Sequence, residues 1–173
     1  MTPERGDIRP ARAVDIPSIA AVVNDAAVAY RGVIPADCWH DPYMPLSELR
    51  QEIDAGVAFS VLEQDDRIVA VMGLQQVGDV ALIRHAYVLA SHQRQGLGGA
   101  LLEHIRRHSA LPMLVGTWRA ASWAVRFYET HGFRCLDTAE TARLLRRYWT
   151  VSPRQMEVSV VLADDRWPES QDG

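Results

Sequence analysis

QRQGLGGALL, residues 93–102, is the stretch of sequence that decides the fold. It follows an apolar run at 80–88 that indicates a β-strand, and it leads into a segment at 98–108 whose pattern predicts a helix. A glycine-rich turn between a strand and a helix presents consecutive backbone N–H groups at the helix N-terminus, and this arrangement binds phosphate. The stretch therefore predicts a ligand that contains phosphate.

Three patterns of glycines make such a turn, and they predict different ligands. The dinucleotide pattern G-x-G-x-x-G fails because Leu101 stands at the third glycine position. The nucleoside-triphosphate pattern requires a Gly-Lys pair, which the chain lacks. The third pattern, Gln/Arg-x-x-Gly-x-Gly/Ala, is matched in full by Gln93, Gly96 and Gly98. Taken alone, the turn leaves one alternative, an ordinary glycine-rich connection without a ligand.

Composition narrows the class of protein. The 173 residues suit one domain, and 48% apolar with 23% charged residues is typical of a soluble globular protein. The net charge of −4 argues against nucleic acid as a partner, because nucleic-acid-binding domains tend to be basic. We find no signal-peptide core and no run of about 18 apolar residues, so we expect a cytoplasmic protein without membrane contact.

Cysteine and histidine spacing gives no metal site. Cys38 and Cys135 form no C-x-x-C motif, and we interpret both as reduced thiols. His104 and His108 have the i, i+4 spacing of a chelating pair, but they lack the glutamate of H-E-x-x-H. We expect this pair on a solvated helix face and predict no metal.

Periodicity and turn residues predict the order of the elements. Asp15 and Ser47 are the expected N-caps of the first two helices. Gly132 is expected at the C-terminus of a later helix. We expect strands at 8–12, 57–63, 67–76, 80–88, 112–118, 133–136 and 156–163, helices at 16–30, 47–55, 98–108, 121–131 and 138–148, and an irregular segment at 31–46.

A second motif, WAVRFYETHGF at 123–133, places Phe127 and Tyr128 before Gly132 and Phe133. On both motifs and the order of elements, residues 7–163 resemble the GNAT superfamily of acetyl-CoA-dependent N-acetyltransferases. Within it, the phosphinothricin-acetyltransferase-like branch looks closest. The chain departs from the family at Ala121, where an asparagine often contacts the pantetheine arm. Residues 1–6 are then a flexible N-terminal arm, and residues 164–173 a polar, frayed tail.

The resemblance implies a fold class and a cofactor. The fold is a single-domain, mixed α/β structure with a twisted, mostly antiparallel sheet flanked by helices. Its sheet opens as a V-shaped cofactor cleft between the strands at 80–88 and 112–118. Acetyl-CoA is the cofactor, and coenzyme A is the product. Many relatives form homodimers through the C-terminal strand, and the apolar segment 156–162 suits that role as well as it suits an ordinary strand.

The resemblance also assigns residues to the cofactor. Backbone amides of the loop bind the pyrophosphate, and the preceding strand pairs with the pantetheine. Val88, five residues before the loop, directs its N–H at the thioester oxygen. The implied cofactor-binding residues are Ala86, Tyr87, Val88, Gln93, Arg94, Gln95, Gly96, Leu97, Gly98, Gly99 and Phe127.

Acetyl transfer to an amine needs a proton donor for the thiolate and a proton acceptor for the amine. The resemblance assigns Tyr128 as the general acid. His85 is a candidate base because a histidine side chain ordinarily titrates near pH 6.5. Strand alternation, however, places Arg84 on the face of Ala86 and Val88 and turns His85 away, unless a bulge intervenes. A water relay is the alternative base.

The acceptor is expected to be a small-molecule amine. Segment 31–46 is rich in proline and aromatic residues, so it is either a packed surface loop or one wall of the acceptor pocket. Arg31 and Arg84 could bind a carboxylate, which suggests an amino-acid-like acceptor. A protein or peptide N-acetyltransferase and a non-catalytic acyl-CoA-binding module are the alternatives. The candidate substrate residues are Tyr30, Arg31, Trp39, Arg84 and Trp118.

Overall fold

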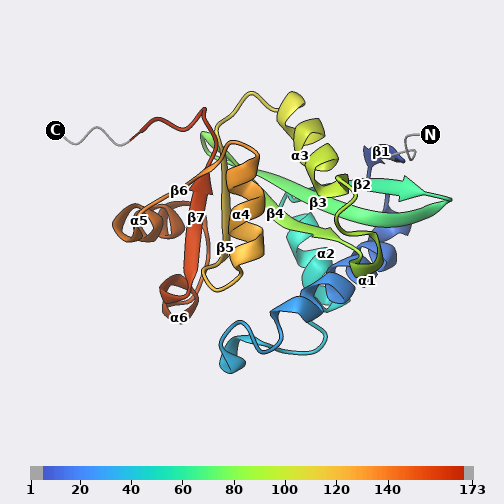
Figure 1. The fold of residues 1–173 in the computed structure, drawn as a ribbon, viewed down its shortest axis with the longest axis horizontal. Helices are drawn as coiled ribbons and strands as arrows, with labels where there is room; N and C mark the ends of the chain where they lie inside the picture. The colour runs from blue at the N-terminus through green and yellow to red at the C-terminus, as the bar shows by residue number, and fades with distance from the viewer. Residues whose placement is uncertain (1–5, 170–173) are drawn as a thin grey trace. The chain divides into compact units, whose positions relative to one another are not determined.

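The computed structural model describes residues 6–169, so the expected arm at 1–6 lies outside the described residues apart from Gly6 (Figure 1). The chain divides into two compact units. The first unit contains Met1–Gln76 and Ile83–Ala110, and the second contains Val77–Leu82 and Leu111–Gly173. The strands form a seven-stranded sheet in the order β1-β2-β3-β4-β5-β7-β6, in which β4 contributes residues to both units. The predicted mixed α/β fold class is confirmed.

The first unit carries two antiparallel strand pairs with defined register. Asp7 pairs with Glu63 between β1 and β2, and Ala58 pairs with Leu74 between β2 and β3. Its elements are β1 (Asp7–Pro10), η1 (Ala13–Asp15), α1 (Ile16–Ala27), η2 (Val28–Tyr30), η3 (Ala36–Cys38), α2 (Leu46–Asp54), β2 (Ala58–Gln64), most of β3 (Arg67–Val77) and of β4 (Val80–Val88), η4 (Ala90–His92) and α3 (Leu97–Arg107).

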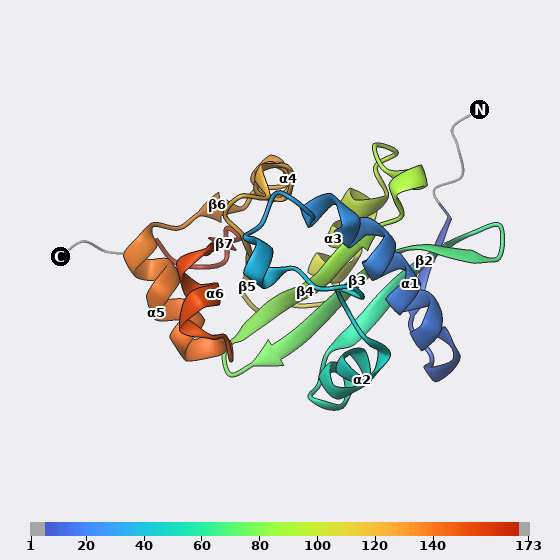
Figure 2. The same cartoon turned by 90° about the horizontal axis from the view of Figure 1, so that it is seen from below.

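Helices cover both faces of this part of the sheet. Helices α1 and α2 lie on one face of β2, β3 and β4, and α3 lies on the other (Figure 1, Figure 2). Because β3 is covered on both sides, its residues 68–72 are all buried, and they read as a continuous apolar run. Helix α1 buries an apolar stripe, whose members are Ile19, Ala20, Val22, Val23, Ala26 and Ala27.

The second unit builds its own apolar core. Helix α4 lies on one face of the strands, and α5 and α6 lie on the other (Figure 2). Leu144, Leu145 and Tyr148 of α5 pack on Leu114 and Val161. Its elements are the start of β4, then β5 (Met113–Trp118), α4 (Ser122–Thr130), β6 (Arg134–Cys135), α5 (Thr138–Tyr148), α6 (Pro153–Glu157) and β7 (Ser159–Ala163).

Of the two predicted caps, one is wrong in position and the other is right in position only. Pro45 occupies the N-cap of α2, and Ser47 lies inside the helix. Asp15 occupies the N-cap of α1 as predicted, but its side chain makes no capping bond to that helix. Its carboxylate instead accepts from the amide of Arg12 at 2.7 Å and from the guanidinium of Arg9 at 2.7 Å. The carboxylate is bonded to Arg9 and Arg12, so it does not accept from the first amides of α1.

The C-terminal region differs from the prediction in two ways. The last strand starts at Ser159 rather than at 156, because Ser152 caps a short helix that begins at Pro153. The tail is not frayed where it begins, since Asp164 is fully buried and accepts from the amide of Met113 at 3.1 Å. Residues 170–173 lie outside the described part of the chain.

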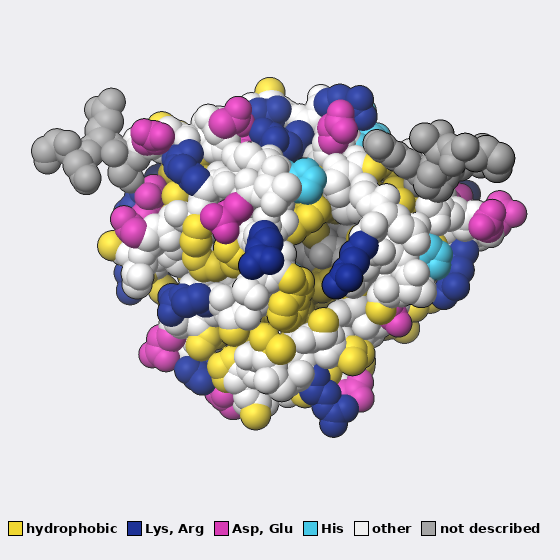
Figure 3. Space-filling view, in the orientation of Figure 1, with side chains coloured by type: hydrophobic (Ala, Val, Ile, Leu, Met, Phe, Trp, Pro, Cys, Tyr) yellow, Lys and Arg dark blue, Asp and Glu magenta, His cyan; other side chains and the backbone are white. Residues whose placement is uncertain are grey.

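Within the described residues, one helical stretch, Ala13–Tyr30, is long and apolar enough to cross a membrane by length and composition. Core helices of soluble proteins meet the same criterion, and here the apolar side chains of α1 are buried inside the first unit. Charged side chains are mixed on the face shown in Figure 3, where the described residues gather into no broad patch of one sign.

Candidate active site

The loop after β4 turns through two left-handed residues before it enters α3. Arg94 has φ 64° and Gly96 has φ 79°. A Cβ added at Gly96 would meet no atom within 4 Å, so the glycine is needed for its conformation and not for space. Gly96 thus has a positive φ, whereas Gly98 lies in the first turn of α3.

The N-terminus of α3 presents unbonded backbone amides. The first intrahelical bond runs from the amide of Ala100 to the carbonyl of Gly96 at 3.0 Å, so the amides of Leu97, Gly98 and Gly99 precede it. No side chain among the described residues caps this end of the helix. Leu97 is only 2% exposed and anchors the turn in the core. Open amides and the positive end of the helix dipole together favour an anion here.

Three hydrogen bonds hold the approach to this loop. The amide of Leu89 donates to Val69 of β3 at 2.9 Å, and the amide of Ala90 donates to the carboxylate of Asp25 on α1 at 2.9 Å. The side-chain amide of Gln93 donates to the carbonyl of Val88 at 3.2 Å. Gln93 therefore stabilises the turn itself, while Arg94 and Gln95 beside it are exposed.

Strand β4 is irregular at His85, whose φ of 55° lies outside the strand region, and we interpret this irregularity as a bulge. Side chains of both Arg84 and His85 contact the carboxylate of Glu52 on α2. The expectation that strand alternation separates these two side chains is therefore wrong, because the bulge breaks the alternation. Gly73 of β3 lies against the bulge, and a Cβ there would come within 2.8 Å of the carbonyl oxygen of Arg84.

The contacts at Glu52 form a charged cluster. Nη2 of Arg84 donates to Oε1 of Glu52 at 3.2 Å, and Nη1 donates to the side chain of Gln75 at 3.0 Å. Burial raises the pKa of Glu52, but the hydrogen bond and charge of His85 and then those of Arg84 outweigh it and lower the pKa below its ordinary value. Arg84, expected to bind an acceptor carboxylate, thus already has a carboxylate partner within the protein.

Aromatic side chains of the 31–46 loop gather around Tyr43. The ring centroid of Tyr43 lies 5.5 Å from that of Tyr30 and 5.7 Å from that of Trp39, on which it stacks. Tyr30 in turn contacts Tyr87 of β4, edge to face, at 6.2 Å. The structure thus brings together the predicted residues Tyr30, Trp39 and Tyr87, while Arg31 is exposed at the start of the loop.

The remaining predicted residues belong to the second unit. Tyr128 of α4 is 5% exposed, and its ring packs edge to face on Phe127 at 5.0 Å and on Phe133 at 5.4 Å. Trp118 ends β5 opposite Ser159 of β7. The roles of Tyr128, Phe127 and Trp118 in binding or catalysis stay predictions.

Residues 20–144 match a family model described as the acetyltransferase (GNAT) domain, which spans more than half of the chain. This protein belongs to the GNAT acetyltransferase family. Among curated protein sequences, none matches it with significance. The phosphinothricin-acetyltransferase-like branch within the family stays a prediction.

Solved structures share the GNAT fold at low sequence identity. PaiA N-acetyltransferase from Thermoplasma acidophilum, in complex with coenzyme A, is 16% identical with a TM-score of 0.67, over 91% of this chain and 97% of that one. The ribosomal-protein-S18-alanine N-acetyltransferase from Escherichia coli is 18% identical with a TM-score of 0.62, over 96% and 97%. N-acetylglutamate synthase from Neisseria gonorrhoeae, with coenzyme A and N-acetyl-glutamate, is 21% identical with a TM-score of 0.60, over 94% of this chain and 35% of that one.

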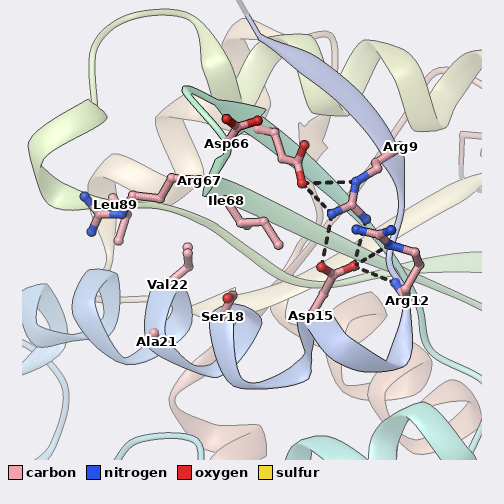
Figure 4. A pocket seen from close by; sticks show the side chains of 11 residues that line it. Arg9, Arg12, Asp15, Ser18, Ala21, Val22, Asp66, Arg67, Ile68 and Leu89 are labelled. Carbon is pink, nitrogen blue, oxygen red and sulfur yellow. Dashed lines mark hydrogen bonds and ion pairs between the residues drawn. The ribbon is translucent and has the colours of Figure 1, made fainter.

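A hollow of about 340 Å³ in the first unit of this GNAT protein lies beside the start of α1 (Figure 4). The guanidinium of Arg9 bridges two of its acidic residues, Asp15 and Glu63. The positive and negative side chains that line this hollow therefore largely neutralise one another. We interpret Arg9, Asp15 and Glu63 as an ion-pair network that joins β1, β2 and η1.

Sequence reasoning missed Glu52, Gln75 and Asp25. Glu52 and Asp25 lie on helices that are remote in sequence from the residues they contact, whereas Gln75 lies on β3, the strand next to Arg84. In the sequence, a glutamate near the end of an amphipathic helix carries no signal that distinguishes a buried carboxylate from a solvated one. No glycine at residue 85 marks the position of the bulge in the sequence.

Proposed function

We propose that this GNAT protein transfers an acetyl group from acetyl-CoA to the amine of a small, amino-acid-like acceptor. The observation that carries the proposal is the open N-terminus of α3, whose first amides make no intrahelical bond. Coenzyme A carries a pyrophosphate, and such a helix end suits that group. The neighbours from Thermoplasma acidophilum and Neisseria gonorrhoeae contain coenzyme A.

We assign residues of this chain to the parts of the cofactor by their positions in the loop, in β4 and in α4. We assign the pyrophosphate to the amides of residues 94–99, which the left-handed Gly96 turns toward the start of α3. The backbone of residues 86–88 is assigned to the pantetheine arm, and Phe127 to an additional contact. The side chain of Gln93 holds the loop in place, because it bonds back to Val88.

The proposed chemistry needs two proton transfers and one oxyanion donor. Bound acetyl-CoA supplies the acetyl group as an activated thioester. His85 takes the proton of the attacking amine, and the hydroxyl of Tyr128 donates a proton to the departing thiolate. The backbone N–H of Val88 donates to the carbonyl oxygen as negative charge develops there.

The aromatic cluster supports a small acceptor. The rings of Tyr30, Trp39 and Tyr43 pack on one another, and a wall built of such bulky side chains suits a closed pocket better than an open groove for a peptide. Arg31 adds an exposed cation at the same loop, and a guanidinium binds a carboxylate through two parallel hydrogen bonds. An acceptor with both an amine and a carboxylate fits this combination.

The test is calorimetric binding of acetyl-CoA together with release of free thiol across an amine panel. The panel pairs free amino acids with their decarboxylated amines and adds peptides with free N-termini. All 18 Lys and Arg residues of the chain are arginine, so lysine acetylation of the enzyme itself adds nothing to the thiol signal. Turnover of amino acids but not of the matched amines supports the proposal. Turnover of peptides alone supports a protein acceptor, and binding without turnover supports an acyl-CoA-binding module.

Gly96→Glu tests the cofactor site directly. A glutamate there strains a left-handed position and repels the pyrophosphate, so binding of acetyl-CoA should be lost. Gly78→Glu is the matched control, since Gly78 also has a positive φ, 57°, with nothing within 4 Å of an added Cβ. Equal binding by Gly96→Glu and wild type, or no binding by the wild type, would contradict the proposed function.

A further inference from the structure

Glu52 and His85 form a contact that is closed to solvent. Oε2 of Glu52 and Nε2 of His85 touch each other, and both atoms are buried. The whole side chains are 19% and 16% exposed. The imidazole ring also stacks on Phe59 of β2 at a centroid distance of 6.2 Å. His85 therefore contacts both a carboxylate and an aromatic ring.

This contact sets the tautomer of the imidazole. An ionised carboxylate only accepts hydrogen bonds, so the nitrogen that touches it carries the hydrogen. Nε2 of neutral His85 is then the donor, and Nδ1 keeps the lone pair. The second oxygen of Glu52 accepts from Arg84, whose positive charge favours the ionised carboxylate. Arg84 is itself held by Gln75, whose side-chain amide donates to the carbonyl of Ala55 at 3.1 Å.

We propose that Glu52 is a positioning residue for His85, holding the imidazole with Nδ1 as the atom that takes the proton of the acceptor amine. The inference rests on the proposed function. The amine proton passes to Nδ1 as the nitrogen lone pair forms the bond to the acetyl carbon, and the Nε2 proton stays on the hydrogen bond to Glu52. The carboxylate then faces an imidazolium, which it stabilises by a charge-assisted hydrogen bond. Within the described residues, the charged side chain in contact with His85 is that of Glu52 on α2, Arg84 of β4 bonds to the same carboxylate, and β2 contributes the ring of Phe59.

A purely structural role is the competing explanation. Glu52 could simply join α2 to the bulge of β4 through Arg84 and His85. Such a structural connection would stabilise the protein whether or not His85 accepts a proton. The two roles therefore differ in whether the effect of Glu52 depends on His85, and a double-mutant cycle measures that dependence.

The experiment compares E52Q, H85N and the double variant by kcat, by KM and by acetyl-CoA affinity. H85N should lower kcat by about 10²-fold, as expected for a general base. E52Q should lower kcat by about tenfold, the size of one charged hydrogen bond, and leave acetyl-CoA affinity unchanged. In the H85N background, E52Q should change kcat by less than about twofold, because nothing is left to position. E48Q is the matched control, since Glu48 is exposed one turn earlier on α2.

The split between kcat and cofactor affinity gives a second readout. E52Q should lower kcat and leave acetyl-CoA affinity at the wild-type value, because Glu52 contacts His85 and Arg84. An equal loss of kcat from E52Q in both backgrounds, or loss of acetyl-CoA binding in E52Q, would overturn the proposal and leave the proposed function standing. Wild-type protein that releases no thiol with any amine would instead overturn the proposed function itself, and with it the role of Glu52.

Discussion

The backbone amide of Ala90 donates a hydrogen bond of 2.9 Å to the carboxylate of Asp25. Through it, helix α1 holds the residue that begins η4, immediately before the glycine-rich loop. An anion site made of backbone amides depends on such supports, because the amides bind well only when they are already oriented. The position of Asp25 thus links a core helix to the geometry of the proposed pyrophosphate site.

Asp25→Ala should weaken acetyl-CoA binding by about tenfold, the lower end of the range for one hydrogen bond to a charged group. Loss of the bond frees η4 to move, so part of the binding free energy goes into ordering the loop. Calorimetric titration with acetyl-CoA measures the effect. Glu103→Gln, an exposed carboxylate on α3, controls for the loss of one negative charge. Equal affinities in Asp25→Ala and Glu103→Gln would show that this tie does not organise the loop.

Gly73→Ala should disturb the bulge at His85. The new Cβ would lie 2.8 Å from both the carbonyl oxygen of Arg84 and Cγ1 of Val57, so β3 and β4 must separate locally. We expect a loss of about 1–3 kcal/mol in the free energy of unfolding, as for other overpacked sites, together with lower kcat. Urea denaturation and the thiol assay measure the two effects.

Gly116→Ala is the control for Gly73→Ala. Its Cβ would approach the ring of Trp149 at 3.5 Å, which is ordinary van der Waals contact. This variant should unfold within about 0.5 kcal/mol of wild type, as substitutions that disturb no packing usually do. A Gly73→Ala variant that is as stable and as active as Gly116→Ala would show that the bulge tolerates a side chain.

Asp15 should make the stability of the first unit depend on pH in the acid range. The hydrogen bond from Arg9 outweighs the effect of burial and lowers the pKa of Asp15 from 3.8 to about 2. Because the folded-state pKa is the lower one, the unfolded chain takes up the proton first on acidification. The stabilising contribution of Asp15 is therefore present above pH 3.8 and is lost as pH falls through about 2. Urea denaturation at several pH values should show Asp15→Asn less stable than wild type at pH 7, with the difference shrinking toward pH 2.

Asp54→Asn is the matched control for Asp15→Asn, because Asp54 lies on the exposed end of α2. Its difference from wild type should stay small at every pH, since an exposed carboxylate gains little from its neighbours. A gap between Asp15→Asn and wild type that stays constant from pH 7 to pH 2 would contradict the role assigned to the ion pair with Arg9.

Tyr43→Ala should raise KM for the acceptor without changing acetyl-CoA affinity. The substitution removes the ring that stacks on Trp39 and contacts Tyr30, so the proposed pocket wall loses its centre. We expect a rise of about tenfold, which corresponds to about 1.4 kcal/mol of lost binding. Tyr43→Phe keeps the ring and should retain the wild-type KM. A Tyr43→Ala variant with unchanged KM would mean that this cluster is a packed surface loop, and not a wall of the pocket.

The sequence predicted the fold well because its strongest signals are local. The left-handed turn at Gly96 and the apolar stripe of α1 depend only on neighbouring residues, and the structure contains both. Contacts between residues that are far apart in the sequence were harder to predict. Alternation along β4 fails at His85 because the bulge reverses the local direction of the side chains, and its partner Glu52 lies 33 residues earlier in the chain. The late start of β7 has a different cause. Ser152 caps a short helix, and this helix takes the residues that were predicted to begin the strand.

Tyr128→Phe should abolish most turnover while acetyl-CoA binding persists. Phenylalanine keeps the packing against Phe127 and Phe133 but removes the hydroxyl that is proposed to protonate the thiolate. The expected fall in kcat is about 10²-fold, the lower end of general-acid contributions. Tyr148→Phe is the control in the same unit, where the lost hydroxyl donates to Asp79 at 2.7 Å. That variant should lose about 1 kcal/mol of unfolding free energy with kcat unchanged, so equal effects of the two substitutions on kcat would remove Tyr128 from the mechanism.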